Sequence, residues 1–254
     1  MVKLSIIIPV YNVESYIQAT AVSLFEQHSP DIEYIFVNDC TPDRSWEVLA
    51  ETLNKYPECR SASKLISLDK NGGVENARIC GLQYAGGEYI WFIDSDDLIA
   101  EGAIKIILEA LTEKAVDYLS INFQIIKDGE KIPAVNNGNI VETISPEELF
   151  SAVISYHGKH AAWRHIVKRF LTLQHPMLKT GLKIAEDYVM HSCWSIHAES
   201  AAIIKTPVYG YVTRQQSVMN SNSRLTILQS TREAIQTLKK FADTLPENKK
   251  NYFL

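Results

Sequence analysis

The sequence predicts an α/β fold with a Rossmann-like, doubly wound and mostly parallel sheet. Two observations in its first half support this prediction. Short runs rich in β-branched and aromatic residues, typical of buried parallel strands, alternate with longer segments that carry apolar residues at helical spacing. The strand-like runs also end in small, polar or acidic residues, at the edge where such sheets bind ligands. The alternating strands and helices are expected at 4–10, 13–28, 33–37, 43–56, 64–68, 73–85 and 88–93.

The elements of this half have clear local signatures. Leu4–Val10 (LSIIIPV) is a continuous apolar run, as expected of a strand buried on both faces. Glu33–Val37 (EYIFV) and Glu88–Ile93 (EYIWFI) continue this pattern. Repeated strand–helix–strand units make neighbouring strands parallel. The first helix gathers its apolar side chains on one face, at Tyr16, Ile17, Ala21, Leu24 and Phe25.

The pattern changes after about residue 116. Asp117–Val135 resembles two strands around an Asp128–Gly129 turn. Ser145 and Glu148 have the spacing of a capping box, which predicts a helix that opens at Pro146. We expect the last helix to pack against the rest of the chain rather than against a membrane or a second subunit. The later elements are a helix at 186–197, a strand at 201–212 and a helix at 226–245 with Ile227, Ala234, Leu238, Phe241 and Leu245 on one face.

Composition and charge exclude several classes of protein. Hydrophobic residues make up 46% of the 254 residues and charged residues 22%, as in soluble globular proteins. The net charge of -5 argues against a nucleic-acid partner. The four cysteines form no CxxC pair and no secretory signal is visible, which favours a cytoplasmic protein with reduced thiols, acting at most on the inner face of the membrane. No apolar run approaches the roughly 20 residues of a bilayer span.

Three carboxylates follow the strand at 88–93, in the segment DSDD (Asp94–Asp97). Like charges this close cost free energy unless a cation neutralises them, and Asp94 and Asp96 are spaced to approach one Mg²⁺ or Mn²⁺ ion. Such a metal could stabilise a diphosphate as a leaving group. Alternatively, the acids cap the next helix or belong to a phosphatase with an aspartyl nucleophile. The phosphatase motif usually follows the first strand and has Thr or Val where Leu98 stands.

Polar residues also follow the other strands. The segment NGGVENARICGL (Asn71–Leu82) has two glycines before a helix that carries Arg78. Glycine allows a ligand to approach the backbone closely, and an early-helix Arg can reach a phosphate or a base. The segment is neither GxGxxG nor a Walker loop, so a plain turn with a solvated Arg stays an alternative. Tyr11 and Asp39 offer a stacking face and a hydrogen-bond acceptor to a nucleoside.

Two acids begin the helix in IAEDYVM (Ile184–Met190). Glu186 and Asp187 could simply favour the helix dipole in its first turn. The alternative is that Asp187 is a general base facing the crevice at the strand ends. Arg214 and Ser217, after the last strand, could contact phosphate or belong to a polar loop.

Taken together, five segments resemble the family-2 glycosyltransferases, whose nucleotide-sugar-binding domain has the GT-A fold. They are SIIIPVYNVESYI, VNDCTPDRSWEV, NGGVENARICGL, GEYIWFIDSDD and AEDYVM, and they occur in the family's order. The resemblance implies a nucleotide-sugar-binding half at 1–115 and an acceptor-side and catalytic-base region at 116–225. An amphipathic helix follows at 226–254. Because the sequence stops on apolar residues, we expect that its tail is truncated.

The resemblance also implies roles for the residues after each strand. Asp39 would contact the uridine, and Arg78 would lie beside the base and the phosphates. Asp94 and Asp96 fall on the family's DxD motif, the first towards the ribose and the second on the metal, with both counted as metal ligands. Asp97 could share that duty. The first part of the nucleotide pocket would be Pro9, Tyr11, Asn12 and Glu14.

The implied reaction is an inverting transfer of a sugar from a UDP-sugar with Mn²⁺ or Mg²⁺ as cofactor. Asp187, paired with Glu186, matches the base that deprotonates the hydroxyl of a saccharide or lipid-linked saccharide acceptor. Family context suggests bacterial surface polysaccharide or glycolipid synthesis, with peripheral membrane contact and a homodimer as further options. The candidate acceptor wall is the segment 155–182, with Trp163, Arg164, Lys168 and Arg169.

Two other functions and some departures from the family pattern need attention. A metal-dependent nucleotidyltransferase or phosphohydrolase is one alternative, but the former should have a glycine-rich basic loop where PVYNVES stands. A non-catalytic nucleotide-sugar-binding protein is the other, disfavoured by intact Asp96 and Asp187. Cys40 stands where Gly is usual, so that turn could differ in backbone conformation. Glu75 and Asn76 replace small residues, which affects the expected donor preference.

Overall fold

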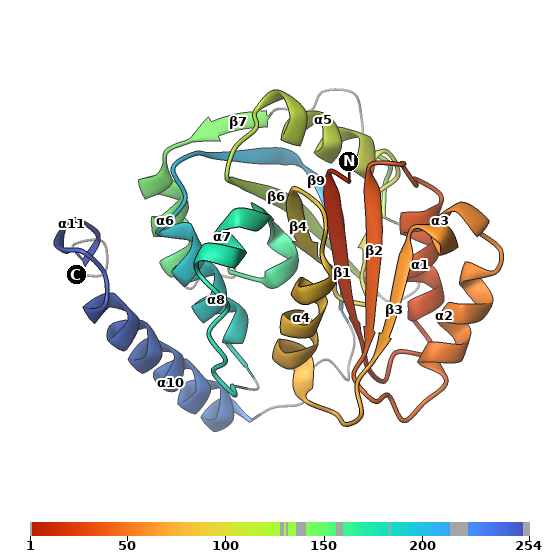
Figure 1. Cartoon of the computed structure of the whole chain (residues 1–254), viewed down its shortest axis with the longest axis horizontal. Coiled ribbons are helices and arrows are strands. Elements are labelled where there is room, and N and C mark those ends of the chain that lie inside the picture. The colour runs from red at the N-terminus through yellow and green to blue at the C-terminus, as the bar shows by residue number, and fades with distance from the viewer. Residues whose placement is uncertain are drawn as a thin grey trace.

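The computed structural model describes residues 2–127, 130, 132–135, 141–155, 160–182, 184–213 and 223–250. These residues form one sheet of nine strands, in the order β3-β2-β1-β4-β8-β6-β9-β5, with β7 paired to β9 (Figure 1). The strands are β1 Leu4–Val10, β2 Ile32–Asn38, β3 Ser63–Ser67, β4 Tyr89–Phe92, β5 Leu98–Ile99, β6 Tyr118–Lys127, β7 Val141–Ile144, β8 His165–Lys168 and β9 Ala201–Thr213.

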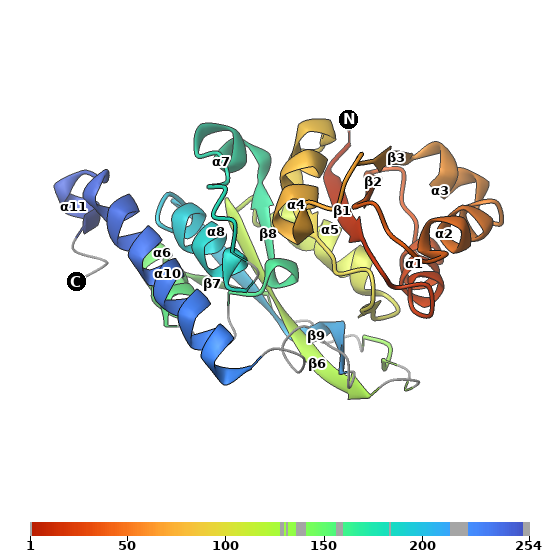
Figure 2. The same ribbon diagram turned by 90° about the horizontal axis from the view of Figure 1, so that it is seen from below.

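The first half is the parallel, doubly wound sheet that the sequence predicts. Leu4 of β1 lies beside Ile32 of β2 and Tyr89 of β4, and all these pairings are parallel. Alternate side chains of β1 enter two different cores, Ile6 with α1, α2 and α5, and Ile7 with α4 and α8. Helices therefore cover both faces, as the opposite positions of α4 and α1 in Figure 2 show. The helices of this half are α1 Ile17–Phe25, α2 Ser45–Leu53, α3 Pro57–Ser61, α4 Gly73–Tyr84 and α5 Ala103–Glu113.

The second half of the sheet is mixed rather than parallel. β8 runs antiparallel to β4 and to β6, whereas β6 and β9 are parallel. The prediction of a second hairpin strand is wrong, because Ile132–Val135 forms no strand. The backbone N–H of Val135 instead donates a hydrogen bond to Glu101 O. The Asp128–Gly129 turn lies outside the described residues. β6 takes its partners from segments far along the chain, which local alternation cannot reveal.

The C-terminal helices confirm two predictions. At α6 (Pro146–Ile154) the capping box is complete, with Glu148 N donating to Ser145 Oγ (3.1 Å) and Ser145 N to Glu148 Oε2 (2.8 Å). α10 (Arg224–Asp243) packs through Ala234 and Leu238 against α8 (Glu186–Ser195), so this part of the helix packs on its own chain as predicted. The remaining helices are η1 Ala162–Arg164, α7 Arg169–Gln174 and α11 Glu247–Lys250.

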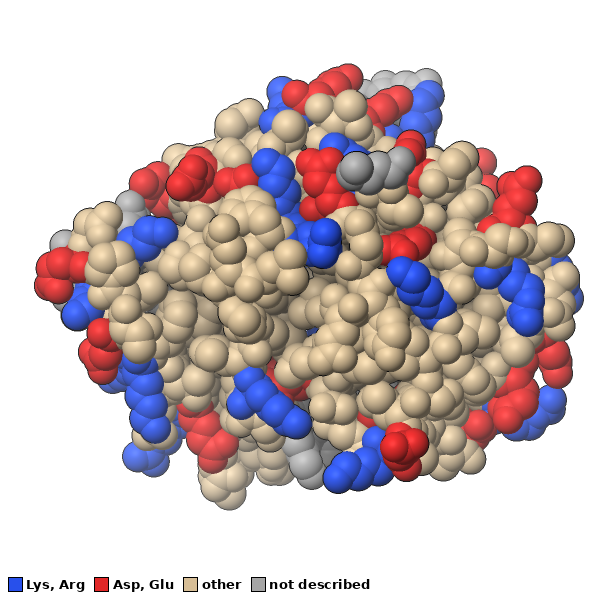
Figure 3. Space-filling view, viewed as in Figure 1, with Lys and Arg blue, Asp and Glu red and all other residues tan. Residues whose placement is uncertain are grey.

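On the face shown in Figure 3, acidic and basic side chains are interspersed. Across the described residues, every helix is too short or too polar to cross a bilayer.

Candidate active site

The predicted site residues meet at the carboxyl edge of the parallel strands. The ends of β1, β2 and β3 and the start of α4 lie along the lower edge of Figure 1. Asp39 follows β2 and Asp94 follows β4, while Arg78 comes from α4 and Glu186 from the start of α8. Because the strands are parallel, their carboxyl ends place residues far apart in the sequence beside one another.

Arg78 joins Asp94, which follows β4, to Glu186 at the start of α8. Its side chain is only 4% exposed; Nη1 donates to Glu186 Oε1 (2.8 Å) and Nη2 contacts Asp94 Oδ1 (3.1 Å). Burial works to lower the pKa of Arg78, but the negative charges of Asp94, Glu186 and Asp187 outweigh burial and raise it. The guanidinium also lies 5.8 Å from the centre of the Phe92 ring. The resemblance implies that Arg78 lies beside the nucleotide. In the structure, Arg78 bridges the carboxylates of Asp94 and Glu186.

The carboxyl groups of Glu186 and Asp187 have raised pKa values. Burial raises the pKa of Glu186 to about 7, the charge of Asp187 adds to this, and Arg78 opposes it. Burial likewise raises the pKa of Asp187 to about 6, against the effects of Arg78 and of the Tyr188 N–H, which donates to Asp187 Oδ1 (2.8 Å). A carboxylate of this pKa is ionised near neutral pH and is more basic than a solvated Asp, as a general base requires.

The turn before this pair is strained. Ala185 has φ = 70°, a left-handed conformation that a residue with a side chain adopts at a cost of roughly 1–3 kcal/mol. Ile184 and Ala185 are nevertheless buried in the cluster that joins α8 to α10. Packing therefore holds the turn that directs Glu186 and Asp187 towards Arg78.

Asp39 ties the loop after β2 to the start of α4. Its side chain is buried, with Oδ1 accepting from Gly72 N (2.7 Å) and Oδ2 from Gly73 N (2.8 Å). Burial raises the pKa of Asp39, and the two N–H donors only partly offset this. Gly73 has φ = 82°, a left-handed conformation that favours glycine. Asp39 thus lies at the carboxyl edge of the sheet, and the contact with uridine that the resemblance implies stays a prediction.

The loop after β1 is fastened to the loop after β2. Asn12 N donates to Thr41 Oγ1 (2.8 Å), and Glu14 Oε2 accepts from Arg44 N (2.8 Å). Two of the predicted pocket residues, Asn12 and Glu14, therefore have bracing roles. Pro9 is buried in β1 beside Val37.

Tyr11 lies in the loop after β1, and Cys40 lies in the loop after β2. Tyr11 is 45% exposed. Cys40 has φ = 56°, a left-handed conformation that favours glycine. The expected difference of this turn from the family pattern stays a prediction.

The three acids after β4 have different environments. Asp94 and Asp96 are partly exposed, and Asp94 keeps 32% of its side chain accessible despite its contact with Arg78. Asp97 is buried; its two oxygens accept from the Tyr209 hydroxyl (2.7 Å) and from Val212 N (2.8 Å). Burial and the charge of Asp94 raise the pKa of Asp97 well above its usual range. Asp97 anchors β9 beneath the site, a role that sequence reasoning missed.

Asp94 and Asp96 suit a metal that is shared with a substrate. The described residues contain no group of three or more His, Cys, Asp or Glu side chains that could hold a metal by themselves. Mg²⁺ and Mn²⁺ commonly bind through one or two carboxylates together with substrate phosphates. A partly exposed pair of carboxylates fits that scheme, with the remaining ligands supplied by a diphosphate and water.

The prediction that Trp163 lines a wall of the acceptor site is wrong, because this residue is buried. Its ring is 5% exposed and stacks on Tyr209, with 4.4 Å between centroids. Lys168 Nζ contacts Asp117 Oδ1 (3.0 Å) and Arg169 Nε donates to Gly87 O (2.9 Å), so these cations hold the sheet together. Arg214 and Ser217 lie outside the described residues.

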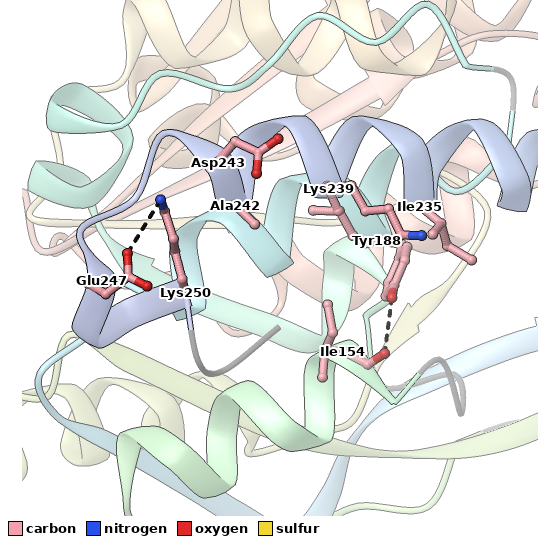
Figure 4. Close-up of a pocket in the computed structure, with 9 residues that line it drawn as sticks. Ile154, Tyr188, Ile235, Lys239, Ala242, Asp243, Glu247 and Lys250 are labelled. Carbon is pink, nitrogen blue, oxygen red and sulfur yellow. Dashed lines mark hydrogen bonds and ion pairs between the residues drawn. The ribbon is translucent and has the colours of Figure 1, made fainter. Parts of the chain in front are cut away.

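An apolar cavity of about 580 Å³ lies between α10, α11, Tyr188 of α8 and the end of α6 (Figure 4). Ile154, Tyr188, Ile235 and Lys239 line it, and the Tyr188 hydroxyl donates to Ile154 O (3.0 Å). None of the predicted site carboxylates lines this cavity.

Sequence and fold place the chain in a known family. The model for glycosyl transferase family 2 matches residues 5–171, and the chain therefore belongs to this family of glycosyltransferases. The mixed α/β sheet is that of GT-A glycosyltransferases. Both the resemblance and the fold class are confirmed.

Individual relatives come from bacterial and archaeal sources. The uncharacterized glycosyltransferase EpsJ of Bacillus subtilis is 31% identical over 218 residues, 82% of this chain and 60% of EpsJ. TarS of Staphylococcus aureus, a poly(ribitol-phosphate) β-N-acetylglucosaminyltransferase, is 26% identical over 85% of this chain and 36% of its own length. The chain therefore spans less than two thirds of either relative.

Solved structures share the fold at low sequence identity. A TarS fragment in complex with UDP-GlcNAc has a TM-score of 0.72 at 21% identity, covering 99% of this chain and 78% of that one. The mannosyltransferase PcManGT of Pyrobaculum calidifontis, in complex with GDP-Man and Mn²⁺, has a TM-score of 0.67 at 16% identity, covering 94% and 64%.

Proposed function

We propose that this protein transfers a sugar from a UDP-sugar to a hydroxyl of a saccharide-type acceptor, with inversion at the anomeric carbon. The observation that carries the proposal is the Arg78 bridge, which brings Asp94 of the DxD motif close to Glu186, the neighbour of Asp187. This arrangement supports a single site for the donor and for the base. The UDP-GlcNAc complex of TarS supports the choice of nucleotide, and the name of TarS, a poly(ribitol-phosphate) β-N-acetylglucosaminyltransferase, supports a polymeric acceptor.

The nucleotide would bind along the loops after β1, β2 and β4. The exposed Tyr11 ring offers a stacking face to uracil, and Asp39, already held by Gly72 and Gly73, keeps lone pairs for a uracil N–H. Asp94 and Asp96 would hold a divalent cation, which neutralises the diphosphate and stabilises UDP as it leaves. Mn²⁺ in the PcManGT complex supports this cofactor.

Asp187 would act as the base on the other side of the sugar. Its carboxylate takes the proton of the acceptor hydroxyl while that oxygen forms a bond to the anomeric carbon. The bond from this carbon to the diphosphate oxygen breaks, and UDP leaves with the electron pair. A single displacement inverts the configuration. Glu186 is held by Arg78 and keeps the start of α8 in place.

A nucleotide panel and two substitutions test the proposal. We expect UDP with Mn²⁺ to raise the melting temperature of the protein, and one of UDP-GlcNAc, UDP-Glc, UDP-Gal or UDP-GalNAc to release UDP on incubation. Asp96→Asn should abolish the Mn²⁺ dependence of both signals. Glu109→Gln, on the exposed face of α5, is the matched control and should leave both unchanged. If wild-type protein neither binds UDP with Mn²⁺ nor releases it from any of these donors, the proposed function is wrong.

Asp187→Asn tests the base separately from donor binding. This substitution keeps the size of the side chain but removes its basicity, so UDP release should fall by about 10²–10⁴-fold. The affinity for UDP should change little, because Asp187 contacts the acceptor side. A parallel loss of affinity and turnover would remove Asp187 from the role of base.

A further inference from the structure

Glu75 makes the most concentrated set of side-chain hydrogen bonds between α4 and the acceptor side. Its carboxylate is 5% exposed and accepts from Thr180 N (2.7 Å), Thr180 Oγ1 (2.6 Å) and Gly181 N (2.9 Å). A buried carboxylate is stable only when donors surround it, and here three donors from one turn do so. This turn belongs to the irregular segment between α7 and α8 that leads into the Glu186–Asp187 pair.

The position of Glu75 on α4 makes the contact informative. Glu75 is three residues before Arg78, so both side chains leave the same face of the helix. Glu75 contacts Thr180 and Gly181, and Arg78 contacts Glu186. One helix face therefore grips the acceptor-side segment at two points, before and after the strained turn at Ala185.

The same helix is joined to the donor side. Its start is fixed by Asp39 through Gly72 and Gly73, and Arg78 also contacts Asp94. A shift of the 180–181 turn relative to α4 would thus be a shift of the base relative to the donor pocket. Gly181 has φ = 70°, so the turn relies on a backbone conformation that most residues disfavour.

We infer that Glu75 is a positioning residue, which holds the segment before α8 so that Asp187 faces the bound sugar. This inference rests on the proposed function. Misplacing a reacting group by about 1 Å can reduce a rate by about 10²-fold, although no contact with the substrate is lost. Glu75 therefore acts on the rate of transfer through Asp187 and not on the affinity for the donor.

Glu75→Gln is the sharpest substitution. It keeps the size of the side chain, but its amide NH₂ faces N–H and O–H donors, so at least one of the three hydrogen bonds is lost. We expect kcat for UDP release to fall by about 10–100-fold, with the Kd for UDP in Mn²⁺ within twofold of wild type. Hydrogen exchange should become faster at the amides of 180–187.

Glu33→Gln is the matched control. Glu33 is another buried carboxylate held by a turn, where Oε1 accepts from Ser5 Oγ (2.6 Å) and Gly86 N (2.6 Å) and Oε2 from Lys64 Nζ (2.7 Å). It lies at the amino end of β2, away from the site. A purely structural effect would lower stability in both variants, whereas only Glu75→Gln should lower kcat.

A double-mutant cycle with Asp187→Asn completes the test. If Glu75 acts through Asp187, adding Glu75→Gln to Asp187→Asn should reduce the residual UDP release by less than twofold. Equal reductions in both backgrounds, or a wild-type kcat for Glu75→Gln alone, would overturn the role of Glu75 and leave the proposed function standing. A wild-type rate for Asp187→Asn, or no UDP release by the wild-type protein, would instead overturn the proposed function and this inference with it.

Discussion

Removing the positive charge of Arg78 from the candidate site should substantially lower the free energy of unfolding. In Arg78→Met, Glu186 loses a partner 2.8 Å away, and both side chains are buried, with 4% and 9% exposed. Deleting one partner of a buried ion pair costs about 3–5 kcal/mol, because the other charge stays desolvated. Water can partly compensate Asp94, whose side chain is 32% exposed. We therefore expect the lower end of the range, about 3 kcal/mol, near pH 8.

The loss should depend on pH in a defined direction. Burial already raises the pKa of Glu186 to about 7 while Arg78 opposes it, so without Arg78 this pKa should rise further. A carboxyl whose pKa is higher in the folded than in the unfolded state binds more protons when folded. Its contribution to stability is therefore lost as the pH rises, by at most about 1.4 kcal/mol per pH unit. The gap between Arg78→Met and wild type should widen from pH 6 to pH 8.

Urea unfolding followed by tryptophan fluorescence at these two pH values measures the gap. Arg44→Met is the control, because Arg44 forms an ion pair with Glu51 at 3.6 Å in which the two side chains are 71% and 68% exposed. That variant should lose less than about 1 kcal/mol at either pH. Equal losses for the two variants, or a gap for Arg78→Met that stays constant between pH 6 and pH 8, would refute the bridging role of Arg78.

Three further predictions concern the base, the sheet and the loop after β4. The rate of UDP release should fall as the pH is lowered through about 6, since Asp187 must be ionised to accept a proton; a pH–rate profile with no acidic limb above pH 5 would contradict this. Gly81→Ala should lower the free energy of unfolding by about 1–3 kcal/mol, because its Cβ would lie 2.4 Å from Ile7 Cγ2; unchanged urea unfolding would show that Ile7 can move. Asp97→Asn should lower stability by about 1–3 kcal/mol by weakening the hydrogen bonds to Tyr209 and Val212, with the Mn²⁺ requirement unchanged; a rise in the Mn²⁺ concentration needed for half-maximal UDP release would make Asp97 a metal ligand after all.

Local sequence patterns were sufficient for the elements that carry their own signal. β1 has the bounds that its apolar run predicts, and α6 begins at Pro146 behind a complete capping box. The pairing of β6 with β8 and β9 was not predictable in this way, because it joins segments about 45 and 83 residues apart, as Ser120 with His165 and Ile203 show. Such register depends on the packing of the whole sheet.

The site was predictable in its location and less so in its internal contacts. Parallel topology alone brings Asp39 and Asp94 to one edge. Sequence reasoning could not show that Arg78 bridges two groups of acids or that Asp97 turns inward to Tyr209, since both depend on side-chain directions set by distant elements. Sequence reasoning identified Glu75 only as a departure from the family pattern, because an acidic residue stands where the family usually has a small one. That departure was the only indication in the sequence that Glu75 has a special role.

Backbone strain is concentrated in the loops that carry the candidate site residues. Among the described residues, four non-glycine residues have positive φ, and three of them, Asn12, Cys40 and Ala185, lie in loops that present site residues. Each such conformation costs about 1–3 kcal/mol and persists only when its surroundings impose it. Asn12 is imposed by its bond to Thr41, and Ala185 by burial beside α10. The hydrogen bonds and packing that join α4, α8 and the strand ends therefore hold the candidate base in one place. They explain why Glu75, which contacts no substrate in this scheme, should influence the rate.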